Sequence, residues 1–352
     1  MVMVNLTING RKVSAPAGST VLEAAQSAGI EIPTLCHHDV LEPIGACRVC
    51  LVEVKGQRTL QPACTFPISE GMEVQSHSDK AMEARRFVLE LLLSDHPLDC
   101  MTCDSTGQCE LQDLMYEYGV DDTRFPGVKH DYALDDPNPF LIRDYNKCIQ
   151  CRRCVRACKE VNGVEAISML WRGFSTKPGT AGDGNLEDSP CEFCGMCVAL
   201  CPTGALRPKY AEGKGRVWQL QQTTSTCPYC GVGCQLDYWT RDNEIVKVTS
   251  HWDGPPNNGW TCVKGRFGFD FVNHPERVTQ PLIKKNGEFV EATWDEALDL
   301  VADKLAEIKK KHGGDAIGVL SSAKCTNEEN YLLQKFTRSV LETNNVDHCA
   351  RL

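Results

Sequence analysis

The sequence predicts an α+β protein made of several small domains in a row. Its 352 residues are enough for about two or three ordinary domains. Its 21 cysteines gather in separate groups along the chain. The residue pattern also changes, from short alternating strands near the start to amphipathic helices after residue 290. Together these features predict cysteine-rich modules followed by part of an α/β domain.

Composition and targeting signals exclude several classes of function. The formal charge is −10, and no basic patch of the kind that binds nucleic acid is present. The first residues lack the basic and apolar regions of a signal peptide, and no apolar stretch reaches the roughly 18 residues of a membrane helix. Cysteines used as disulfides are typical of small exported domains. We therefore expect a cytoplasmic protein without disulfides or a membrane span.

The first modules contain a hairpin and two helices. Residues 4–15 predict two strands around the turn Asn9-Gly10. Residues 20–27 predict a short helix with a Thr20/Glu23 capping box, and the combination suggests a β-grasp domain. Residues 79–94 predict a longer helix, with an apolar stripe that includes Leu91 and ends just before His96.

Later segments alternate between loops and regular elements. Residues 125–139 and 208–215 read as linkers, and residues 179–189 as a loop. Residues 236–240 and 244–248 predict strands, and residues 295–311 and 326–341 predict helices, the second opened by a capping box. Residues 316–320 predict an apolar strand for which the chain supplies too few neighbours to build a parallel sheet. The last domain is therefore expected to be incomplete.

Nineteen of the cysteines and one histidine sort into five sets of four. Thiolates in fours select zinc, copper(I) or iron–sulfur clusters, and five such sets in one chain suggest a path for electrons. The sets are Cys36, Cys47, Cys50 and Cys64; His96, Cys100, Cys103 and Cys109; two sets drawn from Cys148, Cys151, Cys154, Cys158, Cys191, Cys194, Cys197 and Cys201; and Cys227, Cys230, Cys234 and Cys262.

The first two sets lie close to helices. In the first set, Gly45 precedes the Cys47/Cys50 pair and allows the backbone to approach inorganic sulfide; a structural zinc site is the alternative. In the second set, His96 stands at a helix end four residues before Cys100. A lone histidine is more often a surface or core residue, but this position favours a ligand, which makes the site less negative and tends to raise its potential.

The third and fourth sets form an internal repeat of two CxxCxxCxxxC runs. In two-cluster bacterial ferredoxins the fourth cysteine of each run ligates the other cluster. We therefore predict one 4Fe–4S cluster on Cys148, Cys151, Cys154 and Cys201, and a second on Cys158, Cys191, Cys194 and Cys197. Pro202 matches the proline that follows the fourth cysteine, whereas Lys159 does not.

The fifth set opens with a CxxCxxxC run that by itself fits zinc or a radical-SAM loop. The remote Cys262 argues against radical SAM, because that chemistry leaves one iron open. Of the remaining cysteines, Cys325 and Cys349 read as small buried residues. Cys325 follows a strand of a β/α unit, where ligands commonly bind, so it is also a weak candidate for a cofactor contact.

These motifs resemble a known family over essentially the whole chain. The first set resembles the 2Fe–2S domain of the large iron–sulfur subunit of respiratory complex I and of related hydrogenases and formate dehydrogenases. The second resembles the 4Fe–4S site of that family with one histidine and three cysteines. The stretches 262–268 and 273–278 resemble the N-terminal domain of molybdopterin oxidoreductases, most closely formate dehydrogenase.

The resemblance implies domains, cofactors and a relay residue. It implies one 2Fe–2S and four 4Fe–4S clusters, with a molybdenum or tungsten bis-molybdopterin guanine dinucleotide in the full-length enzyme. Lys264 has the place of a lysine that lies between the last cluster and this cofactor, although a surface lysine is the plainer interpretation. The expected domains are 1–78 (2Fe–2S), 79–118 (one histidine, three cysteines), 139–209 (two 4Fe–4S clusters), 220–276 (4Fe–4S) and 277–352 (incomplete molybdopterin domain).

The resemblance favours the electron-transferring part of a formate dehydrogenase that passes electrons to a flavin-, NAD- or ferredoxin-linked partner subunit. Two rivals are a complex I large subunit, which usually has a single ligand set in place of the doubled run, and an iron–iron hydrogenase, which continues into other cysteine motifs. A non-catalytic electron-transfer subunit is the alternative from another class. In formate dehydrogenases the metal ligand, cysteine or selenocysteine, would follow directly after Leu352. We therefore expect a chain cut at a selenocysteine codon and inactive on formate alone, or else an electron-transfer fragment.

Overall fold

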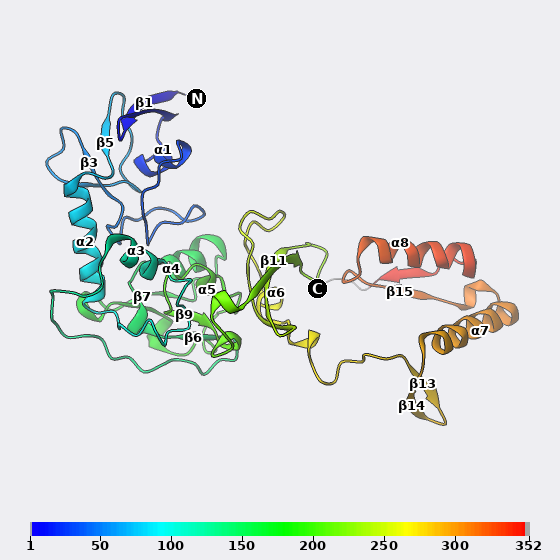
Figure 1. Cartoon of the computed structure of the whole chain (residues 1–352). Helices are drawn as coiled ribbons and strands as arrows, with labels where there is room; N and C mark the ends of the chain where they lie inside the picture. The colour runs from blue at the N-terminus through cyan, green and yellow to red at the C-terminus, as the bar shows by residue number, and fades with distance from the viewer. Residues whose placement is uncertain (1, 349–352) are drawn as a thin grey trace. The chain divides into compact units, whose positions relative to one another are not determined.

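The structure, a computed structural model, describes residues 2–348. The chain divides into two compact units, Met1–Gln221 and Gln222–Leu352 (Figure 1). None of the described helices combines the length and the apolar character needed to cross a membrane. Cys349 and the position after Leu352, on which two of the expectations above depend, lie outside the described residues.

The first unit begins with a mixed five-stranded sheet. Its strand order is β2-β1-β5-β3-β4, with β1 and β5 parallel and the other pairs antiparallel. The predicted hairpin is confirmed, because Asn9 and Gly10 take the positive φ values of 51° and 78° that its turn requires. The Thr20/Glu23 capping box is also present in α1. The bounds are β1 Met3–Ile8, β2 Arg11–Pro16, α1 Val21–Ser27, β3 Leu51–Val54, β4 Gln61–Pro62 and β5 Glu73–Gln75.

Two helices follow, α2 (Asp79–Leu93) and α3 (Glu110–Tyr118). The apolar stripe predicted for α2, Val88, Leu91 and Leu92, is wrong in part: Val88 and Leu92 pack against the core, but Leu91 is 44% exposed. The fully buried stripe consists of Ala81, Arg85, Leu89 and Leu93. Sequence reasoning missed this stripe because an arginine occupies one of its positions. The buried face of α2 joins α3 and cysteines of three different sets in one apolar cluster.

The ferredoxin-like segment consists of short elements: β6 Leu141–Arg143, α4 Arg153–Arg156, β7 Ser168–Leu170, β8 Lys177–Gly179, α5 Met196–Ala199 and β9 Leu206–Pro208. The antiparallel pair of β6 and β9 brings the two ends of the segment together. The predicted linkers flanking it are not free spacers. The Tyr132 N–H donates to Asn146 Oδ1 (2.8 Å), and Lys209 Nζ donates to the Asp136 carbonyl (2.6 Å).

The second unit begins with the sheet β10-β11-β12, whose last two strands contain the two predicted strands, and with the short helix α6. The helices predicted at 295–311 and 326–341 appear as α7 and as α8 with a π-helical continuation. The expectation for residues 316–320 is wrong in part, because the strand begins at Val319 and has a parallel partner, β16. The bounds are β10 Gln221–Thr226, β11 Gln235–Arg241, β12 Glu244–Ser250, α6 Val263–Phe267, β13 Leu282–Lys285, β14 Glu288–Glu291, α7 Trp294–His312, β15 Val319–Ser321, α8 Asn327–Phe336 and β16 Val346–His348.

Candidate metal centres

The first set is assembled within hydrogen-bond distance. The Sγ atoms of Cys50 and Cys64 lie 3.4 Å apart, and the Cys47 N–H donates to Cys36 Sγ at 3.4 Å. Hydrogen bonds from the thiols of Cys47 and Cys64 lower the pKa of Cys36 to about 2, and the same bonds raise the pKa values of their donors. All four cysteines are buried. A group of four buried thiols in which hydrogen bonds favour the thiolate at Cys36 and Cys50 suits a positively charged metal.

A glycine suits position 45, on the loop before Cys47, because of its backbone conformation and not because a side chain would clash there. Its φ is 61°, in the left-handed region that favours glycine. A Cβ at this position would meet Thr65 only at an ordinary contact distance of 3.4 Å.

Arg85 donates hydrogen bonds to the backbone around the Cys47/Cys50 pair. It is fully buried on α2, and its guanidinium donates to the carbonyls of Val49 (3.2 Å) and Leu51 (3.1 Å) and to the Tyr118 hydroxyl (3.2 Å). Since Val49 lies between two of the cysteines, these bonds fix the backbone that aims their thiols. Sequence reasoning missed Arg85, although an arginine inside a buried helical stripe is itself a signal.

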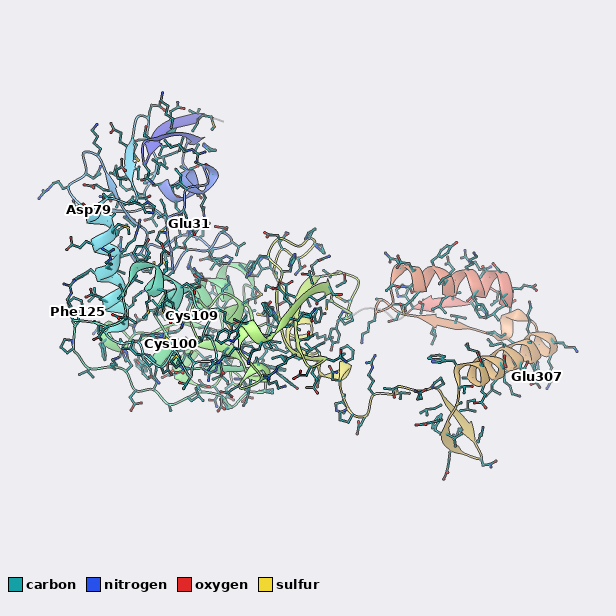
Figure 2. All side chains as sticks on the ribbon, in the orientation of Figure 1. Glu31, Asp79, Cys100, Cys109, Phe125 and Glu307 are labelled. Carbon is teal, nitrogen blue, oxygen red and sulfur yellow. The ribbon has the colours of Figure 1, made fainter. Side chains whose placement is uncertain are left out.

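The second set extends from the end of α2 to the start of α3, where Figure 2 labels Cys100 and Cys109. Burial lowers the pKa of His96 to about 4, so its ring is neutral, the form that binds metals. His96 Nδ1 is buried and has no hydrogen-bond partner among the described residues. Burial also raises the pKa of Cys109 to about 11, with a further contribution from Cys103.

His96 and Cys100 share a charged environment, because Asp99 and Lys147 act on both groups. An orphaned buried imidazole nitrogen in this position fits a ligand role. The described contacts do not include one between His96 and the three cysteines.

The third and fourth sets line two separate cavities. One is lined by Cys148, Cys151, Cys154 and Cys201. The other is lined by Cys158, Cys191, Cys194 and Cys197. The structure therefore brings together the crossed combinations, in which each run contributes its fourth cysteine to the cavity of the other.

The two runs repeat in backbone conformation as well as in sequence. Residues two and four positions after the first cysteine have positive φ in both: Gln150 (53°) and Arg152 (61°) in one run, Phe193 (51°) and Gly195 (71°) in the other. As a result the N–H of Gln150 donates to Cys148 Sγ and that of Phe193 to Cys191 Sγ, each at 3.4 Å. These N–H groups favour thiolates.

Two further N–H donors contact the second cavity. Asn162 Nδ2 donates to Cys194 Sγ at 2.6 Å, and the Ala166 N–H donates to Cys158 Sγ at 3.2 Å. Sequence reasoning missed Asn162, because its contact spans 32 residues.

Ion pairs between buried cations and partly exposed carboxylates tie the second set to the third. Arg153, beside Cys154, makes a two-bond pair with Glu110, beside Cys109, at 2.6 and 2.8 Å. Lys147, beside Cys148, lies 3.1 Å from a carboxylate oxygen of Asp99, beside Cys100. Residues adjacent to the predicted ligands therefore hold the two loops together.

The fifth set lies in the second unit. The Cys227 N–H donates to the Cys234 carbonyl at 2.8 Å, and the charges of Cys230 and Cys262 both act on Cys227. Cys262 is exposed and precedes α6. A Cβ on Gly265 would lie 3.4 Å from Cys227 Sγ, so α6 packs directly on this loop.

The two remaining candidates are not brought to this set by a described contact. Lys264 lies on α6 and is exposed. Cys325 is half-buried in a turn before α8, where its N–H donates to the Ser322 carbonyl at 3.1 Å. Both assignments stay predictions.

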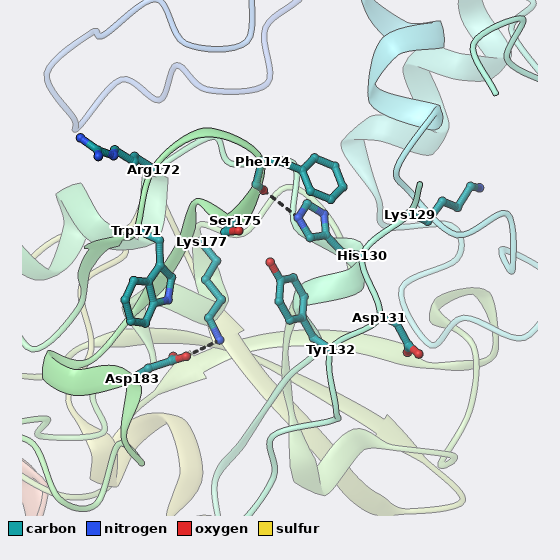
Figure 3. A pocket seen from close by; sticks show the side chains of 10 residues that line it. All are labelled: Lys129, His130, Asp131, Tyr132, Trp171, Arg172, Phe174, Ser175, Lys177 and Asp183. Atoms are coloured by element: carbon teal, nitrogen blue, oxygen red, sulfur yellow. Dashed lines mark hydrogen bonds and ion pairs between the residues drawn. The ribbon is translucent and has the colours of Figure 1, made fainter. Parts of the chain in front are cut away.

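A further pocket contains no cysteine. It has a volume of about 930 Å³ and is lined by aromatic and charged side chains, among them Tyr132, Trp171 and Lys177 (Figure 3). Its polar groups already have partners, since Lys177 pairs with Asp183 at 2.8 Å and His130 donates or accepts bonds at both ring nitrogens. We assign it no ligand.

Thus the described structure defines a class: a chain in which cysteines from separate loops gather into several groups, as in proteins that hold clusters of metal ions. No three of the described His, Cys, Asp and Glu side chains are placed to hold one metal ion. Sulfurs around a polynuclear cluster stand farther apart than those around a single zinc, because each binds a different iron.

Comparison with known families matches five consecutive segments. The families are a 2Fe-2S iron-sulfur cluster binding domain (2–79), the NADH-ubiquinone oxidoreductase-G iron-sulfur binding region (85–124), the ferredoxin-like domain of NADH-quinone oxidoreductase subunit 3 (138–207), the molybdopterin oxidoreductase Fe4S4 domain (220–274) and molybdopterin oxidoreductase (277–352).

Several proteins are similar over nearly the whole chain. The G 2 subunit of NADH-quinone oxidoreductase of Rhizobium meliloti (strain 1021) is 42% identical over 99% of this chain and 40% of its own length. The alpha subunit of NADPH-Fe(3+) oxidoreductase of Geobacter sulfurreducens is 40% identical over the same shares. A protein of Staphylococcus aureus (strain USA300), whose name proposes a formate dehydrogenase, is 34% identical over 98% of this chain and 39% of its own length.

Among solved structures, a chain of an NAD+-reducing NiFe hydrogenase in the H2-reduced state is 33% identical, with a TM-score of 0.57. The match covers 61% of this chain and 91% of that one. The chain therefore belongs to the molybdopterin oxidoreductases with iron–sulfur domains of the NADH-quinone oxidoreductase G type. It spans about 40% of the length of the Rhizobium and Geobacter relatives.

One argument from the sequence is wrong. The doubled cysteine run was expected to weigh against a complex I-like protein. Residues 138–207, which hold all eight of its cysteines, instead match a domain of an NADH-quinone oxidoreductase subunit. The Rhizobium and Geobacter relatives carry NADH-quinone and NADPH-Fe(3+) oxidoreductase names, which favours the complex I-like alternative over formate dehydrogenase.

Proposed function

We propose that this chain carries electrons in a complex I-like oxidoreductase, through one 2Fe–2S and four 4Fe–4S clusters held by the five sets. The observation that supports this best is the pair of cavities lined by the crossed cysteines, Cys148 to Cys154 with Cys201, and Cys191 to Cys197 with Cys158. Clusters bound there would supply one-electron carriers of tunable potential.

The residues of the chain itself do three things for such clusters. Burial of the thiols keeps water away from the clusters. Backbone and side-chain N–H groups, such as those of Gln150 and Asn162, donate to the sulfurs and favour their anionic form. Buried cations beside the ligands, such as Arg153 and Lys147, pair with carboxylates next to other ligands and hold the ligand loops in place.

The shared apolar core supports transfer between neighbouring sites. Cys36 and Cys47 of the first set, Cys109 of the second and Cys151 of the third belong to one buried cluster of side chains. Sites that share a core are close neighbours, so we propose that electrons pass among them inside the first unit. The partner would be a cytoplasmic flavin- or NAD-linked subunit, in keeping with the NADH-linked name of the Rhizobium relative.

Metal analysis tests the proposal directly. Protein purified without oxygen is expected to contain about 18 iron atoms per chain and an equal amount of acid-labile sulfide, with EPR signals of both cluster types after reduction. Protein that contains stoichiometric zinc and shows no EPR signals of iron–sulfur clusters would contradict the proposal. Chelation of the iron should also lower the thermal unfolding temperature, because metal binding and folding are coupled in thiolate sites.

Formate dehydrogenase activity is a second candidate for the whole protein. It rests on the match of residues 277–352 to molybdopterin oxidoreductase and on relatives whose names propose that activity. Formate added to the oxidised full-length protein should then reduce its clusters. Reduction by NADH through a partner subunit, with no response to formate, would favour the complex I-like function alone.

A further inference from the structure

Arg156 is a buried cation whose hydrogen-bond partners are backbone carbonyls. It lies on α4 and is 6% exposed. Its Nη1 donates to the Glu42 carbonyl and its Nη2 to the Cys36 carbonyl, both in the loop of the first set. Its Nε is buried and has no hydrogen-bond partner among the described residues. Two neutral carbonyls therefore hold a full positive charge.

No carboxylate lies within ion-pair distance of Arg156 in the part of the chain that the structure describes. Three other buried cations of this region each have one: Arg143 pairs with Asp135, Arg153 with Glu110, and Lys147 with Asp99 and Asp144. Arg85 also lacks a carboxylate, but its Nε, Nη1 and Nη2 atoms all donate to neutral oxygens, whereas Arg156 Nε has no acceptor among the described residues. Moving a charge from water into the protein interior costs free energy. A nearby opposite charge is needed to offset that cost. The position therefore calls for an anion.

The surroundings of Arg156 indicate which anion it meets. In sequence it stands between Cys154 and Cys158, which line the two different cavities. In space its guanidinium reaches the backbone of Cys36, a residue of the first set. A 2Fe–2S cluster on four thiolates is negatively charged and becomes more so on reduction.

We infer that Arg156 is the counter-charge of the cluster on Cys36, Cys47, Cys50 and Cys64, reaching it from the ferredoxin-like domain, and that it raises the reduction potential of that cluster. The inference rests on the proposed function. Arg156 is a positioning and tuning residue, because it contacts the Cys36 backbone and no reacting atom. A cation fixed at this place stabilises the reduced, more negative state.

Potentiometric EPR titration of the 2Fe–2S signal tests this role, recorded at a temperature at which 4Fe–4S signals have broadened away. In Arg156→Gln, the ratio of reduced to oxidised cluster at a fixed ambient potential should fall about tenfold, which is about 59 mV for one electron. Arg156→Lys keeps the charge and should stay within about twofold of the wild type. Lys159→Gln, which removes an exposed cation on the π-helical segment that follows α4, is the matched control and should change little.

Each result decides the question. Equal shifts in Arg156→Gln and Arg156→Lys would show a purely structural tie to the Cys36 loop and overturn the inference, as would a wild-type potential in Arg156→Gln. If Arg156→Gln takes up no 2Fe–2S cluster, uptake by Arg156→Lys supports a need for the charge, and failure of both variants contradicts it. A wild type without any 2Fe–2S signal would instead defeat the proposed function.

Discussion

At the scale of single residues, the buried cations of the two units have different surroundings. In the first unit, the buried cations Lys147, Arg153 and Arg156 stand within two residues of predicted ligands. In the second, Lys247 on β12 is 6% exposed and lies 4.9 Å from the ring centroid of Trp239. Burial lowers the pKa of Lys247 to about 8. The protonated form is therefore disfavoured in the folded chain.

Replacing Lys247 by methionine should stabilise the second unit in a pH-dependent way. Above the unfolded pKa of 10.5 the lysine is neutral in both states and costs nothing. As the pH falls towards 8 the unfolded chain binds a proton that the folded chain does not, so folding loses stability, and the full penalty is present below pH 8. Lys247→Met should raise the free energy of unfolding by on the order of 2 kcal/mol at pH 7, a figure that allows for the lost cation–π contact. Near pH 10.5 the free energy of unfolding should hardly change.

Thermal unfolding temperatures at pH 7 and pH 10 measure this gain. Lys284→Met is the matched control, because Lys284 lies 5.9 Å from the Phe289 ring at an exposed position. It should show no gain at either pH. An equal gain at both pH values in Lys247→Met would contradict the argument from burial.

At the scale of elements, the repeated run is the feature that chain pattern predicts best. The left-handed residues at equivalent places in the two runs direct N–H groups onto the first cysteine of each. The fourth cysteine of each run, Cys158 or Cys201, follows the end of α4 or α5 and lines the cavity of the other run. The helix starts predicted at Thr20 and Thr326 are confirmed, because both form the reciprocal bonds of a capping box. Thr293 forms a third capping box, which sequence reasoning missed.

The crossed arrangement predicts which cysteine variants resemble one another. Cys201→Ser should lose or alter the same 4Fe–4S signal as Cys148→Ser, and Cys158→Ser the same signal as Cys191→Ser, because each pair lines one cavity. Each variant should lose about four irons if its cluster is not retained. Iron analysis and EPR difference spectra measure this. A match between Cys201→Ser and Cys191→Ser would show that each run binds its own cluster.

At the scale of the whole molecule, charged pairs join modules that the sequence presents as separate domains. The Arg153–Glu110 pair connects the ferredoxin-like segment to the loop of the second set. The Pro202 carbonyl accepts the Glu110 N–H at 2.9 Å beside it. Cysteines of the second and third sets therefore lie on loops that are fixed to each other.

Glu110→Gln should weaken this connection. It leaves the Arg153 guanidinium, whose side chain is 4% exposed, without its carboxylate, at a cost of about 1–2 kcal/mol once the partial exposure of Glu110 is allowed for. Calorimetry of the iron-loaded protein should show a lower unfolding temperature for the first unit. Glu307→Gln, in the exposed Lys304–Glu307 pair, should change stability by less than about 0.5 kcal/mol. Equal effects of the two variants would contradict a buried role for Arg153.

Cysteine spacing by itself indicated five sets of four residues and the pairing expected within the repeat, because metal ligation imposes local distances that chain order records. The type of each module came from the resemblance of the motifs to a known family. Sequence pattern also located the helix caps and the first hairpin. Only the tertiary structure decided which cations stand beside the ligands, as with Arg85, Arg153 and Arg156. Their partners lie more than 30 residues away in the chain, and burial and charge pairing at such separations leave no local pattern. The comparisons moved the favoured function from formate dehydrogenase towards a complex I-like protein, since similar cluster sites serve both.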